Sequence, residues 1–226
     1  MNQFCFVISG PSGVGKTTLV NALLSSFEEL EISVSYTTRS LRGTEVDGQH
    51  YHFIDDGRFD EMVKEDAFAE WAQVHTNRYG TTRETIKRIW ASQKNVLFDI
   101  DYQGEEQLKK AFGKRTISVL VLPPSLQELE HRLRGRGTED EATIQRRMRN
   151  AENEISHFEN FDFILMNDDL EDAQEKVKML YVATKNAVRF WSDRVLALLG
   201  AEKVADSWED QVDLLLGSEN SAKKSE

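Results

Sequence analysis

The sequence predicts an α/β protein in which helices cover both faces of a central parallel sheet and a small mixed sheet is inserted. Three observations predict this fold. Short apolar runs alternate with helical patterns, a glycine-rich loop follows the first apolar run, and a turn-rich segment at 32–82 interrupts the alternation. Strands that alternate with helices form parallel sheets with both faces covered. The 226 residues are enough for one such domain with an insertion.

Four apolar runs are predicted to be buried parallel strands, at 4–8, 96–100, 116–122 and 161–166. Apolar residues recur at helical spacing over 104–112, 126–134, 144–158 and 170–199. Pro123 and Pro124 end the third strand.

The segment 32–82 has a different pattern from the rest of the chain. Alternating residues at 32–36, 51–54 and 68–74 predict short strands, and Asp47-Gly48 and Asp56-Gly57 predict turns. We therefore expect a small, partly antiparallel insertion here.

The loop after the first strand has the spacing G-x-x-x-x-G-K-[ST]. Backbone N–H groups of such a loop surround anionic oxygens, the lysine adds a cation, and the final hydroxyl can bind Mg²⁺. An apolar strand precedes the loop and a helical pattern follows it, which disfavours a chance match in a glycine-rich turn. We expect a polyphosphate site formed by Gly10, Pro11, Ser12, Gly13, Val14, Gly15, Lys16 and Thr17.

Composition excludes several functional classes. No apolar run approaches the roughly 20 residues of a membrane helix, and the first run is a strand and not a signal peptide. The single cysteine, Cys5, excludes an intrachain disulfide and favours a cytoplasmic setting. The net charge of −11 disfavours nucleic-acid binding, so arginines that bind a small phosphate ligand must be clustered locally.

A second phosphate site is predicted around Arg39 and Arg42, with hydroxyls at Ser35 and Tyr51. Guanidinium groups bind phosphate oxygens bidentately, and hydroxyls add neutral donors. The alternative is an exposed turn with two surface arginines.

Glu70 is a candidate for reading a purine base. A carboxylate can accept hydrogen bonds from a ring N–H and an adjacent amine, a donor pair that guanine has, whereas adenine lacks the ring N–H. The Thr81 hydroxyl could donate to O6, and Tyr79 lies nearby in the sequence. The alternative for Glu70 is an exposed strand residue. The neighbouring Trp71 is expected to be a core aromatic residue.

Asp99 and Asp101 follow a buried strand, where ligands of α/β sheets bind. Two carboxylates on one strand face could hold a hydrated Mg²⁺ or a substrate amine. Gly104 allows a close approach of the next segment. Asp101 could also cap the following helix, and both roles are compatible.

Six arginines gather in one short span of this acidic chain. Arginines on a mobile segment can neutralise charge in a phosphoryl-transfer transition state. The alternative is ion pairing with nearby Glu and Asp residues, and some of the six are expected to do only that. A zinc site at His50 and His52 is disfavoured because no third ligand is evident. The six are Arg132, Arg134, Arg136, Arg146, Arg147 and Arg149.

Over residues 3–200 the chain resembles guanylate kinases. The resemblance rests on SGPSGVGKTT, SVSYTTRSLR with GQHYHF, FAEWAQVHTNRYGT, DIDYQG, RLRGRGTE with IQRRM, and MNDDL, in this order. It implies a P-loop three-layer fold with a core (1–34, 84–124 and 156–200), a GMP-binding insertion (35–83) and a helical lid (125–155). Residues 201–226 lie outside the resemblance.

The resemblance also implies roles for individual residues. The P-loop, extended to Thr18, and Asn167 would bind ATP. Lys16, Arg132, Arg136 and Arg147 would be catalytic. Thr17 would bind Mg²⁺, with Asp99 near the hydrated metal. GMP would be bound by Ser35, Arg39, Arg42, Tyr51, Glu70, Tyr79, Thr81 and Asp101. Leu41 and Thr44 depart from the proline and glycine that are usual in the family.

The resemblance implies Mg²⁺-dependent transfer of the ATP γ-phosphoryl group to GMP. The alternative is a catalytically inactive, guanylate-kinase-like module that binds a phosphopeptide, although this chain keeps the P-loop lysine and the lid arginines. The partners implied are ATP and GMP, without nucleic acid or membrane, and a monomer and a homo-oligomer both remain open. Beyond residue 200 we expect one short amphipathic helix, which docks or packs on the domain, and then a disordered tail.

Overall fold

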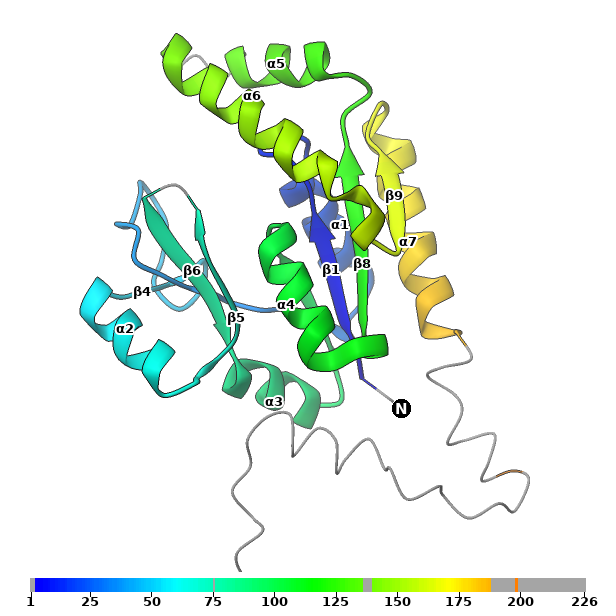
Figure 1. The fold of residues 1–226 in the computed structure, drawn as a ribbon. Coiled ribbons are helices and arrows are strands. Elements are labelled where there is room, and N and C mark those ends of the chain that lie inside the picture. Colours follow the sequence, from blue (N-terminus) through cyan, green and yellow to red (C-terminus); the bar gives the residue numbers. More distant parts are fainter. Residues whose placement is uncertain (1–2, 75, 136–139, 188–197, 199–226) are drawn as a thin grey trace, which may run out of the picture.

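Two sheets organise the part of the chain that the computed structural model describes, residues 3–74, 76–135, 140–187 and 198 (Figure 1). The larger sheet has five parallel strands in the order β2-β7-β1-β8-β9. These strands are β1 (Cys5–Ser9), β2 (Leu30–Ile32), β7 (Asn95–Asp99), β8 (Thr116–Leu122) and β9 (Phe163–Met166). The four predicted strands are confirmed. The three-residue strand β2 was not predicted, because so short a segment has no clear period.

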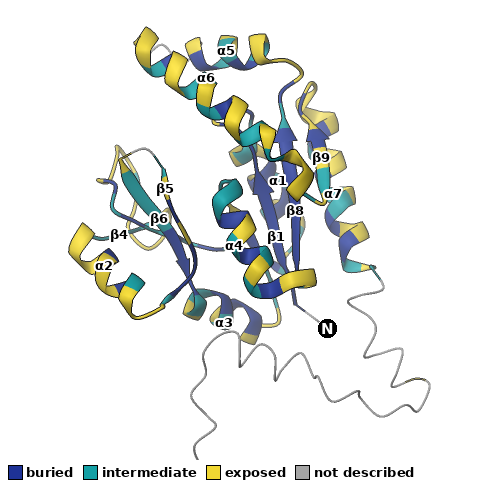
Figure 2. Cartoon of the chain, in the orientation of Figure 1, coloured by how far each residue is buried: buried dark blue, intermediate teal, exposed yellow. Residues whose placement is uncertain are grey.

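Helices cover both faces of this sheet, as predicted. Alternate residues of β1 separate the two cores: Phe6 and Ile8 face α1 (Lys16–Ser26) and α7 (Leu170–Lys185). Cys5 and Val7 face α3 (Arg83–Ala91) and α4 (Tyr102–Phe112). Figure 2 shows β1 and β8 buried between these layers. Two short 3-10 helices, η1 (Gly113–Arg115) and η2 (Phe158–Asn160), complete the connections.

The smaller sheet is mixed, in the order β4-β3-β6-β5. Its strands are β3 (Tyr36–Thr37), β4 (His52–Phe53), β5 (Phe68–Val74) and β6 (Asn77–Thr82). Helix α2 (Asp56–Lys64) packs on it through Phe59 and Met62. The prediction of a turn at Asp56-Gly57 was wrong, because Asp55 accepts a hydrogen bond from the Arg58 N–H and caps α2.

Trp71 is not a core residue. The strand bulges between Phe68 and Glu70, so Ala69 and Glu70 are both buried while Trp71 is 37% exposed. The bulge breaks the simple alternation from which a core position was predicted.

Helices α5 (Leu126–Arg134) and α6 (Glu141–Ser156) pack together through Leu129, Leu133 and Ala151. They lie beyond the carboxyl ends of β1 and β8 (Figure 1). Helix α7 ends at Lys185, so the helical pattern predicted for 170–199 is confirmed only to that residue. Of its remainder, Asn186 and Ala187 lie beyond the helix and Leu198 is helical. The other residues of this pattern and the predicted C-terminal helix lie outside the described residues. None of the helices in the described part has the length and apolarity that a membrane-spanning segment needs.

Candidate active site

The glycine-rich loop leaves β1 at the carboxyl edge of the main sheet. Gly10, Gly13 and Gly15 all have positive φ, a conformation that glycine adopts without strain. A Cβ on Gly10 would lie 2.3 Å from the Val121 carbonyl oxygen. Lys16 begins α1, and its Nζ donates to the carbonyl oxygens of Gly10 and Pro11. The loop thus directs an ammonium group and a helix N-terminus toward one place, as an anion site requires.

The Asn167 side chain is hydrogen-bonded to this loop. Its side-chain amide donates to the Val14 carbonyl oxygen at 2.7 Å, and a Cβ on Gly15 would meet that amide at 2.5 Å. Arg132 Nη2 donates to the Asn167 carbonyl oxygen, while its Nε pairs with Glu128. In this structure Asn167 and Arg132 therefore brace the phosphate loop.

Arg39 is 92% buried and is already paired with an acid. Its Nη1 and Nη2 donate to Glu45 at 2.9 and 2.7 Å, and Glu45 also accepts the Arg42 backbone N–H at 2.8 Å. The hydrogen bond from Arg39 lowers the Glu45 pKa to about 2. Glu45, which sequence reasoning missed, therefore connects the two predicted phosphate arginines. The Arg39 guanidinium also lies 5.3 Å from the centre of the Tyr51 ring.

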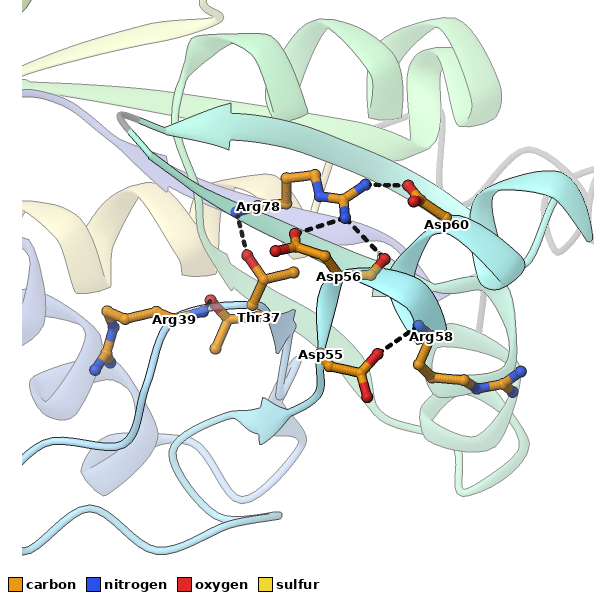
Figure 3. Close-up of polar contacts among 8 residues, drawn as sticks. Thr37, Arg39, Asp55, Asp56, Arg58, Asp60 and Arg78 are labelled. Carbon is orange, nitrogen blue, oxygen red and sulfur yellow. Dashed lines mark hydrogen bonds and ion pairs between the residues drawn. The ribbon is translucent and has the colours of Figure 1, made fainter.

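A separate ion-pair network fixes the small sheet beside Tyr79. Arg78 pairs with Asp56 and Asp60 of α2, and its backbone N–H donates to Thr38. Figure 3 shows the Arg39 side chain extending away from this network. Arg78 thus holds α2 to β6, whereas Arg39 pairs with Glu45.

Glu70 is 3% exposed, so the alternative of an exposed strand residue is wrong. Burial, and to a smaller extent Asp101, raises the Glu70 pKa to about 7, while hydrogen bonds from Thr81 oppose this shift. Its Oε1 has no hydrogen-bond partner in the part of the chain that the structure describes. Beside Glu70, the Ser35 and Thr81 hydroxyl groups are hydrogen-bonded to each other at 3.1 Å. A buried carboxylate with an unpaired oxygen can accept a donor from a ligand.

Asp101 caps α4 by accepting the Gln103 and Gly104 N–H groups. The alternative role as a helix cap is therefore confirmed. Burial raises the pKa of Asp99, and nearby Lys16 opposes the shift. The Asp99 charge in turn contributes to a raised Tyr51 pKa, although burial contributes more.

One cleft of about 430 Å³ brings most of the predicted site together. The predicted residues that line it are Gly10, Ser12, Gly13, Gly15, Lys16, Thr17, Thr18, Ser35, Tyr51, Glu70, Tyr79, Asp99 and Asp101. Arg39 lies just behind Tyr51. Arg42, Thr81, Asn167, Arg132 and Arg147 are not in the lining in this conformation.

Helix α6 reaches the glycine-rich loop through Arg147, whose Nη1 lies 3.5 Å from Ser12 Oγ. Arg134 instead pairs with Glu130 and Glu141, as the ion-pairing alternative expects. Arg136 lies outside the described residues.

Glu154 lines the cleft and was missed by sequence reasoning. It lies seven residues after Arg147 on α6, a spacing that puts both on one helix face. Burial raises its pKa to about 7, with Lys16 lowering and Asp101 raising it. The spacing of seven residues from Arg147 within a predicted helix was the signal in the sequence that could have identified Glu154.

Thr17 and Asp99 both line the cleft, and their oxygens suit a hard cation. Among the described residues, no group of three or more His, Cys, Asp or Glu side chains could hold a metal by itself.

The chain is similar to proteins of one family throughout this region. The guanylate kinase family model matches residues 3–184. Guanylate kinase from Zymomonas mobilis is 49% identical over 173 residues, covering 76% of this chain and 80% of the relative. The enzyme from Sphingopyxis alaskensis is 44% identical over 195 residues, 86% and 87% of the two chains. The crystal structure of guanylate kinase from Anaplasma phagocytophilum aligns with a TM-score of 0.67 at 28% identity, covering 82% and 87%.

Proposed function

Because the chain belongs to the guanylate kinase family, we propose that it transfers the γ-phosphoryl group of ATP to GMP and produces ADP and GDP. One observation carries the proposal: the phosphate loop lines a single cleft together with four residues of the insertion, Ser35, Tyr51, Glu70 and Tyr79. Direct transfer requires two nucleotide sites to share one cavity.

The ATP site is assigned to residues 10–18. Their backbone N–H groups surround the phosphates, and Lys16 moves from the Gly10 and Pro11 carbonyl oxygens to the outer phosphate oxygens. Asn167 holds the loop through Val14. Arg147 reaches the loop from α6, and we assign it, together with Arg132 and Arg136, to the charge of the transferring group.

The GMP site is assigned to the insertion and to the first turn of α4. Arg39, Arg42, Ser35, Tyr51 and Tyr79 bind the acceptor phosphate. Glu70 accepts the guanine ring N–H and amine, with Thr81 and Asp101 beside it. The support comes from Glu70, because a charged carboxylate is expensive to bury unless it meets a partner. Glu70 Oε1 has no hydrogen-bond partner among the described residues.

Thr17 and Asp99 are assigned to Mg²⁺, Asp99 through water. When bound, Mg²⁺ neutralises phosphate charge. The phosphate of GMP is largely ionised at neutral pH, so its oxygen needs no strong base. The chain's own residues therefore position the two nucleotides and exclude water.

We propose that residues 35–83 form the GMP-binding part, residues 125–155 the lid, and the other residues up to 200 the core. We also propose that the protein is cytoplasmic.

A coupled assay of ADP release with GMP, AMP, CMP and UMP tests the function. We expect turnover with GMP alone. Equal turnover with AMP would contradict the guanine-reading role of Glu70. Absence of turnover with all four, together with binding of a phosphopeptide, would favour the inactive binding module.

Lys16→Ala tests the role of the phosphate loop. A rate loss of at least about 100-fold is expected, because transition-state charge loses a cation. Lys178→Ala on the outer face of α7 is the control, since this lysine pairs only with exposed Glu175 among the contacts described. An unchanged rate in Lys16→Ala would remove the loop from the mechanism.

A further inference from the structure

Gly104 lies in the first turn of α4, directly behind the Glu70 carboxylate. A Cβ at this position would lie 2.7 Å from Glu70 Oε2 and 3.0 Å from Ile100 Cδ1. Gly104 has helical backbone angles and not positive φ, so its conformation does not require glycine. Glycine inside a helix is about 0.5–1 kcal/mol less favourable than alanine. The close contact with Glu70 is therefore the physical constraint on this position.

Hydrogen bonds hold together the two elements on either side of this contact, α4 and β5. Asp101 Oδ1 accepts the Gly104 N–H at 3.1 Å and holds the start of α4. Gln107 accepts the Trp71 N–H at 3.1 Å and donates to the Trp71 carbonyl oxygen at 2.7 Å. Trp71 follows Glu70 in β5. Since α4 and β5 cannot easily separate, an added methyl group would displace the Glu70 carboxylate itself.

We propose that Gly104 is a specificity-determining positioning residue, because its missing side chain leaves the space in which Glu70 presents its carboxylate to the base. This inference rests on the proposed role of Glu70. A carboxylate that accepts two donors at once must lie in the plane of the base at a fixed height. Displacement by a few tenths of an ångström weakens both hydrogen bonds, and the second bond distinguishes guanine from a purine without the amine.

The test is Gly104→Ala, assayed with GMP and with IMP, which lacks the exocyclic amine. We expect KM for GMP to rise about tenfold, the preference for GMP over IMP to fall by a similar factor, and KM for ATP to stay unchanged. Gly57→Ala is the matched control. Gly57 is also in the first turn of a helix, and its Cβ would meet only an Asp55 oxygen, at 3.3 Å.

Contact with Ile100 could by itself disturb α4, so a second variant isolates the carboxylate. Ile100→Val removes the Cδ1 atom that lies 3.0 Å from the new Cβ. The pair Ile100→Val with Gly104→Ala should keep the wild-type Tm and still lose preference for GMP over IMP, relative to Ile100→Val alone. A pair that folds normally and keeps that preference would overturn the proposal.

A double-mutant cycle with Glu70→Ala distinguishes the proposed role of Gly104 from the proposed role of Glu70. If Gly104 acts through the carboxylate, Gly104→Ala adds no further loss once Glu70 is shortened. An equal loss in both backgrounds would overturn the role of Gly104. A Glu70→Ala variant with unchanged KM for GMP would instead refute the proposed role of Glu70.

Discussion

Glu45 sets the direction of the Arg39 guanidinium, which we propose binds the phosphate of GMP. Glu45 accepts from both terminal nitrogens of Arg39 and from the Arg42 backbone N–H. One carboxylate thus joins the two arginines of the proposed phosphate site. Preorganised groups bind without the entropic cost of ordering flexible side chains.

Glu45→Gln tests this arrangement. The amide keeps the shape but loses the charge and one acceptor, so we expect KM for GMP to rise about tenfold, corresponding to roughly 1.4 kcal/mol. The kcat should be nearly unchanged. Glu65→Gln, at the exposed end of α2, is the control. A decrease in KM would show that Glu45 competes with the phosphate of GMP.

The raised pKa of Glu70 predicts a pH dependence of stability. Its pKa is about 7 in the folded state, above the ordinary value of 4.5. Its contribution is therefore complete below pH 4.5 and lost as pH rises through 7. Glu70→Gln has no carboxylate to ionise and therefore has no such loss. The difference in free energy of unfolding between this variant and wild type should shift in favour of the variant by up to roughly 3 kcal/mol between pH 4.5 and pH 8.

Denaturant unfolding at pH 4.5 and pH 8, without nucleotide, measures this difference. Glu65→Gln provides the control here too, since its exposed carboxylate lies away from the cleft. Glu154 has a similarly raised pKa, so the wild-type curve contains both contributions. A constant difference between Glu70→Gln and wild type across this range would contradict the assignment.

Among the elements, α4 connects the parts of the molecule that must work together. Its first turn contacts Glu70, and Gln107 binds both backbone groups of Trp71 at the free edge of β5. The Tyr102 and His157 rings lie with their centres 3.9 Å apart and their planes tilted by 37°, and the Tyr102 hydroxyl accepts from Asn153 near the end of α6. Helix α4 therefore has direct contacts with both β5 and the end of α6.

Gln107→Ala should lower the free energy of unfolding by about 1–2 kcal/mol, because two backbone groups of Trp71 lose their partner. KM for GMP should rise moderately, since β5 carries Glu70. The measurement is denaturant unfolding alongside the kinetic assay. The control, Glu106→Ala, removes the exposed neighbouring side chain from the same helix. Equal stability of both variants would show that the edge of β5 needs no such support.

The elements also show which signals in the sequence were sufficient. Four strands of the main sheet (β1, β7, β8 and β9) and helix α5 have clear apolar patterns in the sequence, and their predictions are confirmed. Helix α2 was missed because Asp56-Gly57 resembles a turn until the cap by Asp55 is seen. Glu45 and Glu154 were missed because a charged residue has no period. Their importance depends on which other segments the fold brings near them.

At the scale of the whole molecule, Lys16 lines the cleft between the two sheets, and Arg39 lies behind Tyr51 of the same lining. The net charge is −11, so both cations have the opposite sign to the protein as a whole. If each serves a different nucleotide, the two binding events should be separable by mutation. Ligands that bind only the folded state raise its stability by about 2.7 kcal/mol at 100 times Kd.

Thermal unfolding with GMP or with ADP and Mg²⁺ measures this separation. In Lys16→Ala the increase in Tm with ADP should shrink while the increase with GMP persists, and Arg39→Ala should show the reverse. Each variant serves as the control for the other, because both remove one cation from the same cleft. If either substitution abolished both increases, the cleft would contain a single anion site, and direct transfer between two bound nucleotides would have no structural basis.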